Sequence, residues 1–143
     1  MVLLIAPLCF AGCDAGGIKT VPVTGRVTYN GNPVTEGMVT FMPASSPAGS
    51  IYRPATSQLQ PDGSYNLRTF EPGDGVIPGE YAVAIVAFDH DTWAPPQYPG
   101  DEPDYTVPKK YVRPDTSGLE AVIPADASGP LEINFELEGE LGD

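Results

Sequence analysis

From residue 20 onward, apolar and polar side chains alternate with a period of two rather than with the 3.6-residue period of a helix. In the first segment the apolar positions are every second residue: Val21, Val23, Val27 and Tyr29, with Gly25 between them. Turn signals rich in Gly, Pro, Asn and Asp separate such segments from one another. The pattern predicts seven short strands at residues 21–29, 38–42, 56–60, 64–69, 80–88, 119–123 and 131–137. Seven short strands without a convincing helix predict an antiparallel β-sandwich.

The strongest of these strands is residues 80–88, which are apolar at almost every position. Tyr81, Val83 and Ile85 are predicted to face the core of the domain. The opposite face carries Ala82, Ala84, Val86 and Phe88. Because that face is too apolar for free contact with water, another segment is expected to cover it.

The first thirteen residues, MVLLIAPLCFAGC, form a short apolar stretch that ends in small residues and a cysteine. Such a stretch is typical of a signal peptide and is too short to cross a bilayer as a helix. Its end, Phe10-Ala11-Gly12-Cys13, resembles the lipobox of bacterial lipoproteins, which implies that Cys13 carries lipid. Residues 1–12 are then a signal peptide whose missing basic residues indicate a start codon further upstream, and residues 13–19 are the lipidated cysteine and a tether. The alternative is a buried N-terminal strand with an ordinary core cysteine.

The charge of the chain restricts its partners. Seven basic and 19 acidic residues among 143 give a net charge of −12, so the surface repels phosphate backbones and nucleic acid is excluded as a partner. A hydrophobic content of 41% excludes a disordered chain. No apolar run reaches the roughly 18 residues of a transmembrane helix. One small, acidic, folded domain is expected.

Several turn–strand motifs follow one another in a fixed order. They are Val23-Thr24-Gly25-Arg26-Val27-Thr28, Gly31-Asn32-Pro33-Val34, Gly37-Met38-Val39-Thr40-Phe41, Asp62-Gly63-Ser64-Tyr65, Pro78-Gly79-Glu80-Tyr81 and Pro108-Lys109-Lys110-Tyr111. The series resembles small bacterial lipoproteins with a carboxypeptidase regulatory-like, or transthyretin-like, domain, over residues 20–138. The resemblance implies a single antiparallel seven-stranded Greek-key β-sandwich of the transthyretin-like, or prealbumin-like, type. It also implies an accessory or interaction scaffold without a catalytic centre of its own.

Groups that could perform catalysis are few. His90 is the only histidine, no Gly-x-Ser-x-Gly motif occurs, and both cysteines lie in the first thirteen residues. One histidine without a free thiol cannot readily complete a zinc site. We therefore predict a protein that is not an enzyme, with no catalytic residue, cofactor or metal. Two alternatives stay open, a carboxylate pair at glycosidase spacing and calcium held by one acidic loop: Asp89, Asp91, Asp101, Glu102 and Asp104.

Residues 89–118 form the longest segment outside the predicted strands and hold Trp93, Tyr98 and Tyr105 among six prolines. Proline lowers the ordering cost of binding, and aromatic rings offer stacking area. One interpretation is that Trp93 or its neighbours fold over the apolar outer face of residues 80–88. The other is a ligand surface for a sugar or a peptide, formed by these three aromatic residues.

Together these features predict a membrane-anchored extracytoplasmic lipoprotein that serves as a non-catalytic binding or structural accessory domain. Its location is the cell envelope, facing the periplasm or the cell surface, with the lipid on Cys13 as the membrane contact. Envelope proteins or glycans are the expected partners. The alternative function is a carbohydrate- or peptidoglycan-binding module that uses the loop 89–118. The sandwich is predicted to occupy residues 20–138, followed by an acidic tail at 139–143.

Overall fold

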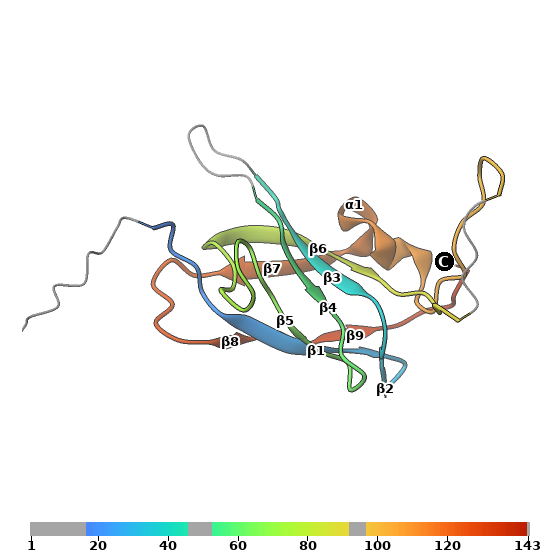
Figure 1. Ribbon diagram of the computed structural model, residues 1–143, viewed down its shortest axis with the longest axis horizontal. Coiled ribbons are helices and arrows are strands. Elements are labelled where there is room, and N and C mark those ends of the chain that lie inside the picture. The colour runs from blue at the N-terminus through green and yellow to red at the C-terminus, as the bar shows by residue number, and fades with distance from the viewer. Residues whose placement is uncertain (1–16, 46–52, 92–96, 143) are drawn as a thin grey trace, which may run out of the picture.

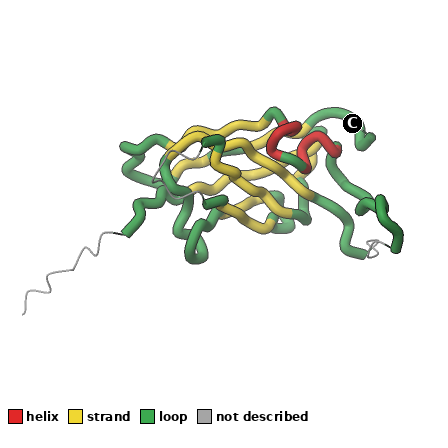
Figure 2. Tube along the Cα trace, turned by 90° about the horizontal axis from the view of Figure 1, so that it is seen from above, coloured by secondary structure: helices red, strands yellow, loops and turns green. Residues whose placement is uncertain are grey.

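Two β-sheets pack against each other in the computed structural model, which describes residues 17–45, 53–91 and 97–142 (Figure 1). Nearly all regular structure in these residues is strand, and the helical turns are confined to one stretch (Figure 2). The elements are β1 (Val23–Tyr29), β2 (Asn32–Pro33), β3 (Met38–Pro43), β4 (Ala55–Gln58), β5 (Ser64–Asn66), β6 (Gly79–Val86), η1 (Lys109–Val112), α1 (Pro114–Ser117), β7 (Leu119–Ile123), β8 (Leu131–Glu132) and β9 (Phe135–Leu137). The predicted all-β, sandwich-like fold is confirmed at this level.

The first sheet is arranged around β1, which has partners along both of its edges. β5 and β2 pair with it antiparallel along one edge. β8 and β9 pair with it parallel along the other, so that Thr24 lies opposite both Asn66 of β5 and Glu132 of β8. The prediction of a purely antiparallel sandwich is therefore wrong for this sheet, which is mixed.

The parallel pairing follows from the path of the chain after β7. The connection at residues 124–130 returns to the end of the sandwich where residues 17–22 enter. There the Lys19 Nζ donates to the Ala125 carbonyl at 2.6 Å, and the Leu131 amide donates to the Pro22 carbonyl at 2.9 Å. The last strands therefore start beside the beginning of β1 and run in the same direction.

The predicted strand at 131–137 is divided into β8 and β9. Between them the Asn134 side chain takes the place of a backbone carbonyl, because its Oδ1 accepts the Arg26 amide at 2.8 Å. The register does not change across the interruption, since Thr24 pairs with Glu132 and Val27 with Phe135. This division and the two-residue β2 account for nine strands in the described residues where the pattern predicted seven.

The second sheet has the order β4-β3-β6-β7 and is antiparallel throughout. As predicted, Tyr81, Val83 and Ile85 of β6 are buried against the core. β7 pairs only with the first half of β6, up to Val83. Beyond that point residues 105–117 continue along the same edge, where the Thr106 amide donates to the Ala87 carbonyl at 2.9 Å.

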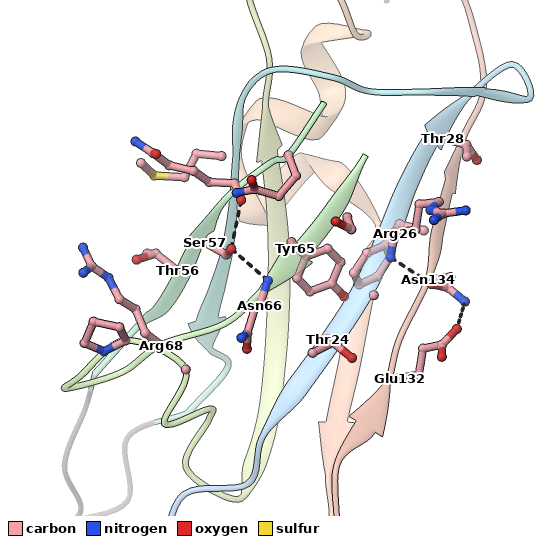
Figure 3. Close-up of a pocket in the computed structure, with 18 of the residues that line it drawn as sticks. Thr24, Arg26, Thr28, Thr56, Ser57, Tyr65, Asn66, Arg68, Glu132 and Asn134 are labelled. Carbon is pink, nitrogen blue, oxygen red and sulfur yellow. Dashed lines mark hydrogen bonds between the residues drawn. The ribbon is translucent and has the colours of Figure 1, made fainter. Parts of the chain in front are cut away.

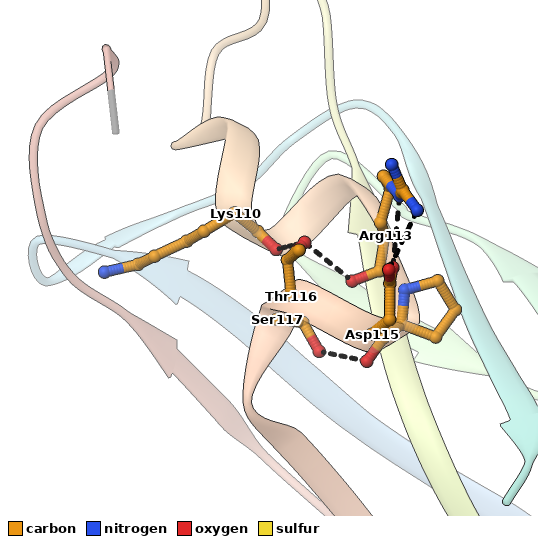
Figure 4. A network of polar contacts seen from close by, with 6 residues as sticks. Lys110, Arg113, Asp115, Thr116 and Ser117 are labelled. Carbon is orange, nitrogen blue, oxygen red and sulfur yellow. Dashed lines mark hydrogen bonds and ion pairs between the residues drawn. The ribbon is translucent and has the colours of Figure 1, made fainter.

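The helical turns η1 and α1 belong to this edge segment and pack against β6. The Ser117 hydroxyl donates to the Val83 carbonyl at 2.5 Å. The Thr116 hydroxyl donates to the Lys110 carbonyl at 2.8 Å (Figure 4). Pro114 opens α1, and Gly118 ends it at a φ of 67°. The pattern predicted no helix here, because four residues are too few to show a helical period. In the described residues, no helix has the length and apolar character needed to cross a membrane.

The core between the sheets contains four aromatic rings from four different strands. The Phe41 ring of β3 lies 6.5 Å from that of Tyr65 (β5) and 6.0 Å from those of Tyr81 (β6) and Phe135 (β9), measured between centroids. Such pairs add about 0.5–1.5 kcal/mol each to the burial of their area. The cluster joins both sheets and fixes the strands β5 and β9, which also carry the candidate site described next.

Candidate functional site

Of the three aromatic residues predicted as a ligand surface, the structure describes Tyr98 and Tyr105, whose rings make no contact with each other. Cys13, the predicted lipidation site, and Trp93 lie outside the described residues. Tyr98 is 72% exposed in the loop after residue 97. Tyr105 is half-buried, and its backbone forms an isolated bridge with Phe88 beside β6. Neither tyrosine belongs to the lining of the two hollows described below, and neither ring contacts another described ring.

Two of the acidic residues weighed as calcium ligands, Asp101 and Glu102, are engaged in separate contacts. The Asp101 carboxylate accepts the amides of Gln97 and Tyr98, each at 2.9 Å, and so closes a loop turn. Glu102 forms an ion pair with Lys109, and this hydrogen bond raises the pKa of the lysine. Across residues 17–45, 53–91 and 97–142, no three His, Cys, Asp or Glu side chains are grouped so that they could hold a metal ion.

His90 has contacts of a structural kind. Its Nε2 lies 3.7 Å from the Glu36 carboxylate, and its ring centroid lies 4.9 Å from that of Phe88. A hollow of about 460 Å³ lies beside this pair, between residues 29–36 and residues 88–89 and 106. The arrangement supplies a carboxylate and an aromatic ring to the imidazole.

A larger groove of about 1100 Å³ extends over the outer side of β1, β4, β5, β8 and β9 (Figure 3). We refer to it as the polar groove. Its lining is dominated by hydroxyl, amide and charged side chains: Thr24, Arg26, Thr28, Thr56, Ser57, Gln58, Gln60, Ser64, Asn66, Arg68, Glu132, Asn134 and Glu136, together with Gly25, Met38, Tyr65, Pro72, Gly73 and Phe135. Figure 3 places Arg68 and Thr56 on one side of the Tyr65 ring and Glu132 and Asn134 on the other.

The alternation of each strand delivers these side chains to the groove. On β1, Val23 and Val27 are fully buried, so Thr24 and Arg26, at the alternate positions, point outward. On β5, Tyr65 is buried while Asn66 is exposed. The registers then align outward residues of neighbouring strands into rows, of which Glu132, Thr24 and Asn66 form one.

Some polar groups of the groove are held by the fold itself. The Ser57 hydroxyl accepts the Asn66 amide at 3.0 Å, and the Asn134 Nδ2 donates to Glu132 at 3.0 Å. The hydroxyl of Tyr65 donates to the Ile133 carbonyl beneath the groove, and burial raises the pKa of Tyr65 well above its usual range. These contacts make the floor rigid.

Other side chains of the groove make no such contacts. The following form no side-chain hydrogen bond or ion pair with another described residue: Thr24, Thr28, Thr56, Gln58, Asn66 and Arg68. Arg26 is held only loosely, with its guanidinium 3.6 Å from the Asp62 carboxylate. The hydrogen bonds from Ser64 lower the pKa of Asp62, so that carboxylate is charged at neutral pH. The groove therefore offers donors and acceptors that are directed to solvent.

Sequence reasoning missed the polar groove. The signal was present in the outward positions of the predicted strands, where Thr, Asn, Gln and Arg side chains outnumber Lys and Glu. Alternation identifies such positions, but only the registers between strands show that they share one surface.

Comparison with known proteins identifies no family. No protein-family profile matches the chain, and no curated protein matches it. Among solved structures, a 9R-lipoxygenase from Cyanothece PCC8801 overlaps with a TM-score of 0.38 at 10% sequence identity. The overlap covers 85% of this chain but 16% of the lipoxygenase chain. A likeness this loose carries no argument about fold or activity.

Proposed function

We propose that this protein is a membrane-anchored extracytoplasmic lipoprotein whose β-sandwich serves as a non-catalytic binding or structural accessory domain in the cell envelope. The sandwich is of the transthyretin-like Greek-key type, with seven principal strands when β8 and β9 are counted as one and β2 as part of a turn. The lipobox-like ending at Cys13 supports the anchor. The order of the turn–strand motifs supports the domain type.

The observation that carries the binding role is the polar groove. It presents uncommitted hydroxyl, amide and guanidinium groups to solvent. The orientation of the domain is consistent with this role. Residues 17–22 leave the sandwich beside the β7–β8 connection, whereas the loop after residue 97 lies at the opposite end (Figure 1). An anchor at Cys13 would therefore be attached at the end of the sandwich that lies opposite this loop.

Metabolic labelling with a radioactive fatty acid tests the anchor. Cys13→Ser is expected to abolish labelling and to leave the precursor uncleaved, because the sulfur is the site of lipid attachment. Cys9→Ser is the matched control, since it removes a thiol from the same apolar stretch and should leave labelling intact. Lipid incorporation in the Cys13→Ser variant would contradict the anchor. Turnover of generic ester, amide or glycoside substrates by the purified protein would contradict the non-catalytic role.

A second candidate function is a carbohydrate- or peptidoglycan-binding module that uses the loop 89–118. The observation that favours it is the 72% exposure of Tyr98, a ring available for stacking on a sugar. Tyr98→Ala should then lower retention on insoluble peptidoglycan. Tyr105→Ala should lower it less, because Tyr105 is half-buried beside Phe88. Unchanged retention in both variants would exclude this loop as the binding surface.

A further inference from the structure

We infer that the polar groove binds a short, uncharged oligosaccharide laid across the strands. This inference rests on the proposed binding role and names its ligand class and its residues. It moves the ligand surface from the aromatic loop to the outer side of β1, β4, β5, β8 and β9. The argument depends on the free polar groups, on their spacing and on the local balance of charge.

The free polar groups match the chemistry of sugar hydroxyls. A hydroxyl both donates and accepts hydrogen bonds, and it is best met by side chains that can do the same. The groove supplies such side chains in Asn66 and Gln58, which are amides, and in Thr24 and Thr56, which are hydroxyls. None of the four has a side-chain hydrogen bond to another described residue that a ligand would have to break.

The spacing of these groups fits several sugar units rather than one. Glu132, Thr24 and Asn66 are direct neighbours on three adjacent strands, and the Thr56–Arg68 bridge joins β4 to the chain just after β5. Four strands about 4.8 Å apart extend over about 14 Å. A ligand that follows this row meets a polar group at each strand, which suits a repeating chain of hydroxyl-bearing rings.

The charge of the groove differs from that of the whole protein. Two basic side chains, Arg26 and Arg68, balance two acidic ones, Glu132 and Glu136, although the chain carries a net charge of −12. A polyanionic ligand would meet the acidic protein around this neutral strip and be repelled. An uncharged ligand meets no such field, so the electrostatics favour a neutral sugar chain.

The floor of the groove indicates how the ligand is held. Tyr65 and Phe135 are 2% and 7% exposed, and both rings belong to the core cluster. They cannot act as stacking platforms for sugar rings. Recognition therefore relies on hydrogen bonds, each worth about 0.5–1.5 kcal/mol net, and removal of one partner should weaken binding about two- to tenfold.

The test is titration of the full 143-residue chain with soluble hexamers, followed by amide chemical shifts in NMR and by calorimetry. The probes are a glucose hexamer, an N-acetylglucosamine hexamer and, as the charged comparison, a galacturonic acid hexamer. At least one neutral hexamer should bind and shift amides of residues 24–28 and 64–68. Asn66→Ala and Thr24→Ala should each weaken that binding about two- to tenfold.

Thr40→Ala is the matched control. Thr40 is a half-buried threonine like Thr24, but it lies on β3 of the other sheet, outside the groove lining. Its removal should leave binding unchanged, and unaltered urea midpoints of all three variants would show that folding is intact.

Three results would overturn the inference. The first is the absence of binding to either neutral hexamer, and the second is tighter binding of the galacturonic acid hexamer. The third is binding that Tyr98→Ala abolishes while Asn66→Ala leaves it intact, which would transfer the site to the loop. None of these results affects lipid labelling at Cys13, so failure of this inference is distinguishable from failure of the proposed anchor.

Discussion

Gly25 occupies a position of β1 where the alternation pattern predicts an inward, apolar side chain. The structure explains why glycine stands there instead. The Tyr65 hydroxyl crosses this point to reach the Ile133 carbonyl on the neighbouring strand. A methyl group on Gly25 would lie 2.7 Å from that hydroxyl oxygen and closer still to the Ile133 carbonyl oxygen. Because backbone blocks the site, Gly25→Ala cannot be accommodated by turning a flexible side chain.

The expected cost of Gly25→Ala combines two effects. Overpacking of a close-packed site costs about 1–3 kcal/mol, and loss of the Tyr65–Ile133 hydrogen bond adds about 1 kcal/mol. We therefore expect the free energy of unfolding to fall by about 2–4 kcal/mol, measured by urea denaturation with circular dichroism. In a Tyr65→Phe background the same change should cost about 1 kcal/mol less, since the hydrogen bond is already absent.

Gly129→Ala is the control for this experiment. No atom lies within 4 Å of a methyl group at that position, and its backbone has no left-handed φ. Its effect should be neutral, or stabilising by about 0.4–1 kcal/mol through a less flexible unfolded chain. Equal midpoints for Gly25→Ala and Gly129→Ala would refute the close approach of β1, β5 and the segment between β8 and β9.

Three further changes test other parts of the fold. Ile85→Ala should lower the free energy of unfolding by about 2–5 kcal/mol in urea, because Ile85 is fully buried on β6. Ser117→Ala should lower it by about 1–3 kcal/mol, since it leaves the Val83 carbonyl without its hydroxyl partner; an unchanged midpoint would contradict that contact. Burial raises the pKa of Asp74, but hydrogen bonds from the amides of residues 69–71 outweigh it and hold the pKa below 3.8. The resulting stability is present above about pH 4 and lost as pH falls through the folded-state pKa, so Asp74→Asn should lose less stability than the wild type between pH 6 and pH 3.

The features that could be predicted are those that one strand determines by itself. The burial of Tyr81, Val83 and Ile85 follows from the apolar pattern, because a strand turns every second side chain to one face. The same rule gives the buried positions of β1. Local sequence is sufficient here because the solvent contact of each side chain depends on its own strand.

Other features depend on the segments that lie beside a strand, and the alternation of apolar and polar residues does not identify those neighbours. The parallel pairing of β1 with β8 and β9 is set by the return path at 124–130. The break at Asn134 depends on an amide 108 residues away along the chain. α1 is a four-residue turn that begins at Pro114, is ended by Gly118 and packs against β6. The first two features depend on contacts between residues far apart in the sequence, and the third is too short to show a period. A periodicity argument detects neither kind.

The composition of the polar groove gives a last argument about its role. The core needs only that outward positions of β1 and β5 be polar, and charged Lys and Glu side chains would satisfy that need while keeping the edges soluble. Instead Thr24 stands on β1, Asn66 on β5 and Arg68 just after β5, and their polar side-chain groups are left unpaired by the described residues. Folding gains nothing from side-chain donors and acceptors that are directed to solvent, since water satisfies them equally in the unfolded chain. The β-propensity of threonine accounts for Thr24, whereas the unpaired side-chain amide of Asn66 contributes nothing to the sandwich and agrees with the proposed recognition of a hydroxyl-rich ligand.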